Sequence, residues 1–237
     1  MEGSVPGHGL TGIADAGAFL ARLIRFDPQA LVRLRPAASA GRTTLWGLLP
    51  WGVLVSRTVS GTAPGDVTVS AKALLAELSA NGPALPPRRD ADWQHPLPPS
   101  VGRVVEVLPG DELRRLAAAA ARTRRAAATG GAEGRTTGQR RLRDALLDHV
   151  AVVVTESENC PTRVEVPQRL VQAVVQMGFL GRRREAGAED ADGENQADVV
   201  HVRLVGHWIA LSAPYGIAWL RSVDRLSIFP IYHRANG

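Results

Sequence analysis

The chain has 237 residues, 45% hydrophobic and 22% charged, enough to bury the core of one large domain or two small ones. Its apolar runs end well short of the roughly 18 residues of a membrane span, and its N-terminus lacks the pattern of a secretory signal. A single cysteine, Cys160, excludes an internal disulfide and a zinc site built from several cysteines. We therefore expect a cytoplasmic protein that does not bind membranes.

Arginine carries almost all of the positive charge. The net charge is +5, and Lys72 is the only lysine among the 28 basic residues. The segment 114–143 holds nine arginines against one acid, Glu133, an excess of +8 that is larger than the excess of the whole chain. Such a concentration of charge attracts phosphates or acidic proteins and implies no sequence specificity.

The first half, residues 1–80, is predicted to be a small α+β unit. Apolar residues on one face predict a helix over 14–25. Ser70 is suited to cap a second helix over 71–79. Alternating apolar residues and β-branched runs predict strands at 31–35, 44–49, 52–59 and 67–69.

Residues 81–102 are rich in proline and are predicted to be a linker to a second α+β half, residues 103–237. The Ala- and Arg-rich composition after Pro109 predicts a helix to about residue 127, and two further helices are predicted at 139–149 and 168–177. The acidic stretch 185–198 is expected to be a disordered loop. Strands are expected at 103–107, 150–155, 163–166, 199–204, 208–212, 217–220 and 226–232.

Two helix starts recur at almost the same spacing. Val67-Thr-Val-Ser-Ala-Lys-Ala-Leu and Val164-Glu-Val-Pro-Gln-Arg-Leu-Val are 97 residues apart, and each combines a short strand with the start of a helix. The helix openings at Asp15 and Asp111 are 96 residues apart. These spacings indicate two halves built alike, on either side of the proline-rich segment.

This order of elements resembles the repeat of the DNA sliding clamps, and Gly65-Asp-Val-Thr-Val-Ser-Ala-Lys-Ala-Leu-Leu-Ala-Glu-Leu resembles the clamp segment that enters the second helix. Two features depart from the clamp pattern: the first half has no clear strands between Leu78 and Val104, and the second has at most one strand between its helices. The resemblance implies an α+β fold of two similar halves, each an antiparallel sheet with two helices on one side, and self-association around a duplex. It also implies that basic residues of the helices face the duplex, namely Arg22, Arg25, Lys72, Arg114, Arg115, Arg122, Arg125 and Arg169.

An alternative for the C-terminal part is a winged helix, with 199–212 as its wing. The helix 168–178 would then enter the major groove. The side chains available for base edges would be Gln168, Arg169, Gln172 and Gln176. Val171, Val174 and Val175 argue against it, because they indicate a helix packed on a sheet.

Catalytic motifs are absent from the sequence: it has no GxxxxGK[ST], HExxH, GxSxG or paired CxxC. Acidic residues that could hold Mg²⁺ are Asp144, Asp148, Glu156, Glu158 and Glu165, but the lysine that restriction-like nucleases need lies far upstream. His201 and His207 have no evident third metal ligand. We therefore expect a non-enzymatic protein without cofactor or metal. An enzyme with a site of scattered residues, such as these acids with His149, stays a further alternative.

The favoured function is nucleic-acid binding through phosphate contacts by arginine-rich helices, with clamp-like tethering of other proteins and self-association. The helices contribute the basic residues named above together with Arg140, Arg141 and Arg143. The rival function is a protein–protein interaction scaffold, whose contact surface would be Trp46, Trp51 and Trp93.

Overall fold

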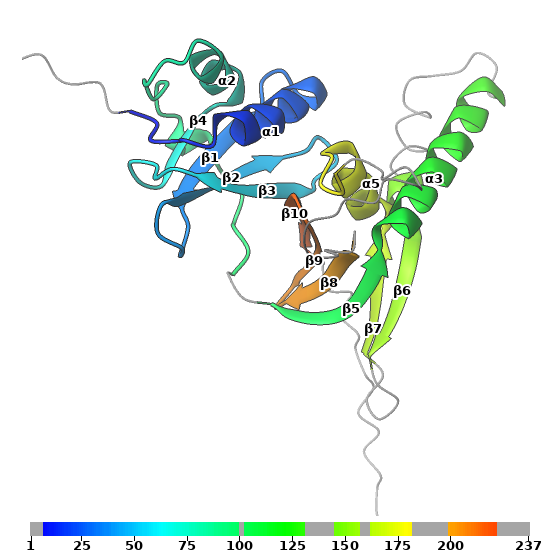
Figure 1. Cartoon of the computed structure of the whole chain (residues 1–237). Helices are drawn as coiled ribbons and strands as arrows, with labels where there is room; N and C mark the ends of the chain where they lie inside the picture. The colour runs from blue at the N-terminus through cyan, green and yellow to red at the C-terminus, as the bar shows by residue number, and fades with distance from the viewer. Residues whose placement is uncertain (1–6, 100–101, 131–144, 157–161, 182–198, 222–237) are drawn as a thin grey trace, which may run out of the picture.

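The computed structural model describes residues 7–99, 102–130, 145–156, 162–181 and 199–221, and it shows helices packed on an antiparallel sheet (Figure 1). The helices are α1 (Ile13–Phe26), α2 (Ala71–Ser79), α3 (Gly110–Gly130) and α5 (Gln168–Gln176). The strands are β1 (Leu31–Pro36), β2 (Arg42–Leu48), β3 (Leu54–Ser60), β4 (Val67–Ser70), β5 (Arg103–Pro109), β6 (Val150–Glu156), β7 (Thr162–Pro167), β8 (Val199–Val205), β9 (Trp208–Ala213) and β10 (Gly216–Arg221).

One eight-stranded sheet runs through both halves of the chain. Its order is β4-β1-β2-β3-β10-β9-β8-β5, and β6 and β7 form a separate pair. The halves join where β3 pairs with β10, antiparallel, over Leu54–Ser56 and Ile217–Trp219. The predicted α+β fold, with antiparallel sheets that carry helices, is confirmed.

The helix starts repeat as predicted, but the strands around them do not. The pair β4–α2 corresponds to β7–α5, and α1 corresponds to α3. In the first half the three-stranded meander β1–β2–β3 follows α1, whereas in the second half the meander β8–β9–β10 follows α5. Among the described residues, α2 is followed by no strand of the sheet before β5. The two meanders therefore meet at β3 and β10, and with β4 and β5 at the two ends they make the shared sheet.

The main core lies between the helices and the sheet. In α1 the buried residues Ala16, Phe19, Leu20 and Leu23 recur at helical spacing and face the sheet. Gly47 in β2 allows this close approach, because a Cβ atom there would lie 2.7 Å from Leu23 Cδ2. The helix α2 begins where expected, since the Ser70 side chain accepts a hydrogen bond from the Ala73 amide at 3.4 Å.

The opposite face of the sheet is covered by the proline-rich segment. A second apolar cluster contains Trp46, Leu54 and Trp219, and Trp93 and Leu97 of the segment pack against it. The regular structure of described residues 81–99 is one turn of 3-10 helix, Asp90–Asp92, as expected for a proline-rich stretch.

Charged groups fix this segment to the first half. The Thr68 amide donates to Asp90 Oδ1 at 2.6 Å, and the Arg89 amide donates to the Thr68 carbonyl at 2.7 Å. The Thr68 amide hydrogen bond lowers the pKa of Asp90. Nearby, the Arg33 guanidinium donates to both oxygens of Asp66, at 2.6 and 2.8 Å, and this bond lowers the pKa of Asp66 and raises that of Arg33.

Several predicted segments fall outside the described residues. They are most of the helix 139–149, the acidic loop 185–198 and the last strand 226–232. Among the helices that the structure describes, none is both long and apolar enough to cross a bilayer.

Candidate nucleic-acid interface

Helix α3 presents a row of arginines to solvent. Arg115, Arg122 and Arg125 are all exposed, as expected from spacings that place them on one side of a helix. Arg114, in contrast, is half-buried and donates to Asp111 Oδ1 and to the Leu180 carbonyl, both at 3.0 Å. Arg114 therefore ties α3 to the segment that follows α5, whereas the side chains of the other three arginines are exposed to solvent.

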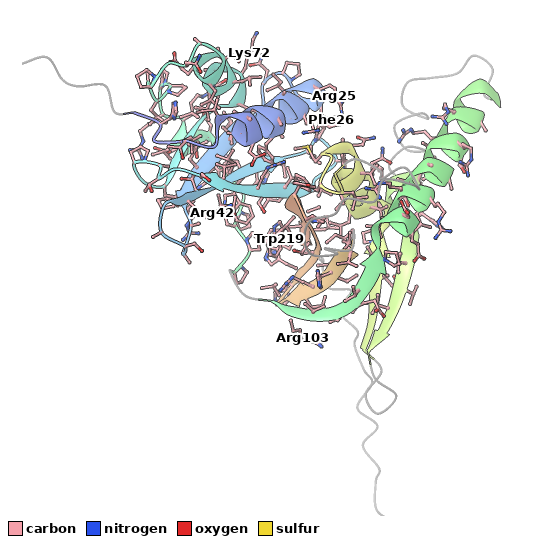
Figure 2. All side chains as sticks on the ribbon, in the orientation of Figure 1. Arg25, Phe26, Arg42, Lys72, Arg103 and Trp219 are labelled. Atoms are coloured by element: carbon pink, nitrogen blue, oxygen red, sulfur yellow. The ribbon has the colours of Figure 1, made fainter. Side chains whose placement is uncertain are left out.

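The basic residues of the first half lie at two separate places on the helices. Figure 2 shows Lys72 on α2, well away from Arg25 at the end of α1. Arg25 is exposed, donates to the Gln176 carbonyl at 3.3 Å and lies 4.9 Å from the centre of the Phe26 ring. Arg22 is half-buried, and its guanidinium covers Gly178, where a Cβ atom would lie 2.9 Å from Nε.

Arg169 has a structural role that the sequence did not reveal. Its Nη1 donates to the Trp51 carbonyl at 2.8 Å, its Nη2 pairs with Asp148, and the Trp51 indole donates back to the Arg169 carbonyl at 3.3 Å. These contacts fasten the β2–β3 hairpin to α5. The remaining predicted phosphate ligands, Arg140, Arg141 and Arg143, lie outside the described residues.

The three tryptophans do not form an exposed patch. Trp46 is 9% exposed in the second apolar cluster, so the prediction that it faces a partner is wrong. Trp51 packs edge-on against Phe26 with ring centres 5.3 Å apart, and Trp93 docks on the second cluster. Each of the three indoles therefore packs against other parts of the fold.

The winged-helix alternative is wrong as well. Gln168 and Gln172 are 5% and 6% exposed, and α5 packs on β9 and β10 rather than projecting into solvent. Its valines face the core, as their spacing indicated. The glutamine side chains of this helix are therefore not placed to contact base edges in the major groove of a duplex.

The acidic residues do not converge in the part of the chain that the structure describes. No group of three histidine, cysteine or carboxylate side chains there could hold a metal ion. Asp148 is paired with Arg169, and Glu165 lies exposed on β7. Asp144 and Glu158 lie outside the described residues.

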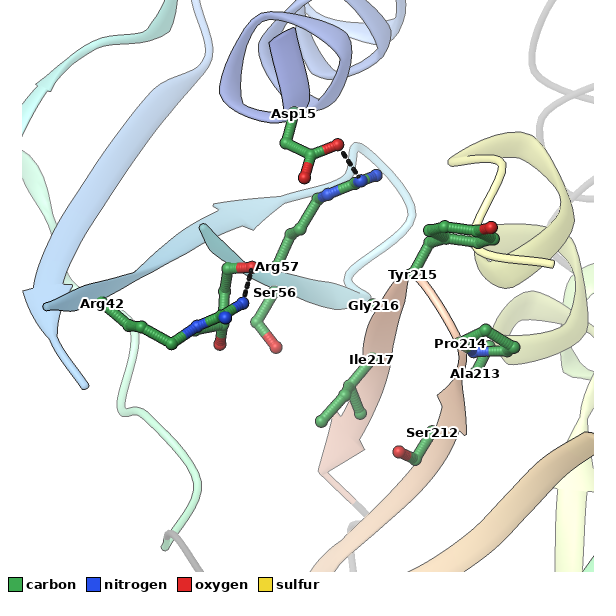
Figure 3. Close-up of a pocket in the computed structure, with 11 residues that line it drawn as sticks. Asp15, Arg42, Ser56, Arg57, Ser212, Ala213, Pro214, Tyr215, Gly216 and Ile217 are labelled. Atoms are coloured by element: carbon green, nitrogen blue, oxygen red, sulfur yellow. Dashed lines mark hydrogen bonds and ion pairs between the residues drawn. The ribbon is translucent and has the colours of Figure 1, made fainter. Parts of the chain in front are cut away.

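A polar cavity of about 330 Å³ lies at the seam between β3 and β10 (Figure 3). Arg57 enters it from β3, pairs with Asp15 at 2.5 Å and lies 5.6 Å from the centre of the Tyr215 ring. Arg42 lines the other wall and donates to the Thr58 carbonyl at 3.3 Å. Both guanidinium groups already have hydrogen-bond partners within the protein. They therefore stabilise the seam between β3 and β10 and are less available to a ligand.

Sequence reasoning missed Arg57, although a signal was present. Val55, Arg57 and Val59 share one face of β3, and both valines are fully buried. An arginine at the central position of a buried strand face requires an acidic or carbonyl partner. The partner itself, Asp15 on α1, comes from a contact across 42 residues that no local pattern indicates.

Solved structures of DNA polymerase sliding clamps have the same fold. The DNA polymerase III beta chain from Streptococcus pneumoniae matches with a TM-score of 0.55 and 10% identity, over 90% of this chain and 64% of the clamp. The beta subunit from Streptococcus pyogenes gives 0.51 and 12%, over 90% and 63%. A sliding clamp from Pseudomonas aeruginosa gives 0.50 and 15%, over 95% and 66%. This chain therefore has a clamp-like fold and spans under two thirds of each of these clamps.

The amino-acid sequence assigns the chain to a protein family. Residues 97–225, more than half of the chain, match the family described as Domain of unknown function (DUF8185), and the chain belongs to that family. Residues 10–95 match a second description, Domain of unknown function (DUF8010). A search of curated protein sequences gives no match.

Proposed function

We propose that this protein binds nucleic acid through phosphate contacts made by the arginines of its helices. The observation that carries the proposal is the exposed row Arg115, Arg122 and Arg125 on α3, within a clamp-like fold. Exposed guanidinium groups form strong charge-assisted hydrogen bonds with phosphate, and each phosphate neutralised releases counterions from the duplex. Arg25 and Lys72 add exposed charge on α1 and α2.

A salt titration tests the proposal. Binding to generic duplex DNA, followed by fluorescence anisotropy, is expected to weaken steeply with salt, with a slope of about 0.9 per phosphate engaged. The double variant Arg122→Glu/Arg125→Glu is expected to abolish binding and to leave the circular dichroism spectrum unchanged, because both side chains are exposed.

The matched control is Arg42→Glu/Arg103→Glu, which makes the same change in net charge. Both residues are exposed on strands, and Figure 2 shows them on the sheet side of the molecule, away from the helices. The control is expected to keep most of the affinity. Equal losses of affinity in the two double variants would show that binding depends on net charge alone. Unchanged affinity in the α3 variant would show that the proposed surface does not bind DNA.

We propose further that copies of the chain associate around a duplex and tether other proteins to it. The support is the clamp-like fold, which the chain shares over about 64% of the length of a solved clamp. Retention on closed circular DNA, with release after linearisation, is the expected result. A protein that leaves circular and linear DNA at equal rates does not encircle the duplex.

A further inference from the structure

A second cavity, of about 230 Å³, lies where the two halves meet. Pro50 and Trp51, at the tip of the β2–β3 hairpin, form one wall. The other walls are Arg124 from α3, Leu147, and Gln172 and Gln176 from α5. The volume is below the roughly 300 Å³ at which pockets for drug-sized ligands begin, so the cavity suits a single small group.

The aromatic wall of this cavity is held in place. The Trp51 ring meets Phe26 edge-on at an interplanar angle of 80°, and its indole nitrogen donates to the Arg169 carbonyl. The Arg169 guanidinium in turn holds the Trp51 carbonyl at 2.8 Å. Because the ring is fixed from both sides, a planar ligand that stacks on it loses little energy to reorganisation of the protein.

The polar walls have hydrogen-bonding capacity that the protein does not use. Within the described part of the chain, the side chains of Arg124, Gln172 and Gln176 form no hydrogen bond or ion pair. One turn earlier on α5, the buried Gln168 Nε2 is also without a partner there. Burying the Gln168 amide nitrogen unpaired costs free energy, whereas the Gln172 and Gln176 amides keep hydrogen-bonding capacity for a ligand in the cavity.

The combination of groups favours a nucleobase. Each glutamine amide offers a donor and an acceptor side by side, the arrangement that pairs with base edges. A tryptophan ring and an arginine plane are the surfaces on which unstacked bases rest. None of the described residues that line the cavity is acidic, Arg25 lies beside it, and the nearby Arg169 guanidinium is paired with Asp148. A cationic ligand is therefore disfavoured.

We propose that the cavity between the β2–β3 hairpin, α3 and α5 holds one unstacked base of single-stranded nucleic acid, stacked on Trp51 and hydrogen-bonded by Gln172 and Gln176. The proposal rests on the proposed function, because the exposed arginines of α3 supply the phosphate contacts beside the pocket. It adds a contact that depends on the base and not on charge.

The test compares oligonucleotides of equal length and charge. A 12-nucleotide oligothymidylate, a 12-nucleotide oligodeoxyadenylate and a 12-unit abasic deoxyribose phosphate are titrated by anisotropy at low salt. At least one base-bearing strand is expected to bind roughly tenfold more tightly than the abasic strand, the size typical of stacking one base on an aromatic side chain.

The variant Gln172→Met keeps the side-chain length and removes the amide. It is expected to lower the tenfold preference to roughly threefold, because a hydrogen bond is lost while stacking on Trp51 remains, and to leave the salt slope unchanged. The control, Gln94→Met, replaces an exposed glutamine of the proline-rich segment and is expected to keep the tenfold preference.

The outcomes separate the two proposals. Equal, salt-dependent binding of all three strands overturns the base pocket and leaves the phosphate surface intact. A tenfold preference for bases that is undiminished in Gln172→Met places the base elsewhere and also overturns the pocket. Failure of every strand to bind at low salt overturns both proposals, and Trp51 would then be tested as a docking point for an uncharged peptide side chain.

Discussion

Two aromatic rings connect the halves of the protein through its core. Phe19 lies on α1 of the first half and Phe179 directly after α5 of the second, with ring centres 6.5 Å apart and planes 4° from parallel. Both side chains are 1% exposed or less. The Gly216 backbone closes over the Phe179 ring, where a Cβ atom would lie 2.5 Å from the nearest ring carbon.

Phe179→Ala is therefore expected to lower the free energy of unfolding by about 3–5 kcal/mol, the usual range for a buried phenylalanine. The surrounding strands and helix leave little freedom for the cavity to collapse, which favours the upper part of that range. Removal of Phe19 as well is expected to cost less than the sum of the two single changes. The difference, the coupling energy of the ring pair, is expected to be about 0.5–1.5 kcal/mol.

The assay is urea unfolding followed by tryptophan fluorescence and circular dichroism. Because one core spans both halves, the wild-type protein is expected to unfold in a single transition seen equally by both probes. Val107→Ala is the control, since this valine is 47% exposed and its loss is expected to change stability by no more than about 0.5 kcal/mol. Strictly additive effects of the two phenylalanine changes, or two separate transitions in the wild type, would refute a shared core.

Two further predictions concern the first half. Gly47→Ala is expected to destabilise the protein by about 1–3 kcal/mol in thermal unfolding, because the added methyl group meets Leu23, whereas Gly17→Ala in α1 has room at 3.8 Å from Leu75 and is expected to stabilise it. Hydrogen bonding from Arg33 lowers the pKa of Asp66, so this carboxylate stabilises the fold at neutral pH, and the contribution is lost as the pH falls below about 4. The loss is expected to be about 1 kcal/mol or less because the pair is partly exposed, and Asp66→Asn should remove that part of the acid dependence.

The local elements were predictable because their causes are local. Ser70 fixes the start of α2 as its side chain suggested, and the apolar spacing in α1 gave that helix to within one residue at each end. The seam between β3 and β10 was not predictable in the same way. It joins residues more than 150 positions apart through three residue pairs, and no sequence pattern specifies that pairing.

The candidate sites show the same difference between features with local causes and features that depend on long-range contacts. Helical spacing was enough to group Arg115, Arg122 and Arg125. It could not show that Arg169 is used to hold Trp51, or that a tryptophan in an apolar hairpin would be buried on the second face of the sheet. Leu45, Trp46 and Gly47 are consecutive buried positions of β2, so this strand lacks the alternation that distinguishes inward from outward positions. The cavity at Trp51 needs three elements that meet only in the folded chain.

The proline-rich segment gives the two ends of the eight-stranded sheet different properties. At β4, the outward amide and carbonyl of Thr68 are taken by residues 89–90, and the prolines around them cannot donate ladder hydrogen bonds. At β5, no strand in the described part of the chain pairs with the outer edge, and Val104 and Val107 are 42% and 47% exposed. An edge of this kind is the usual place for a second chain to add. In the part of the chain that the structure describes, a strand from a second copy could therefore add to this sheet at β5 and not at β4.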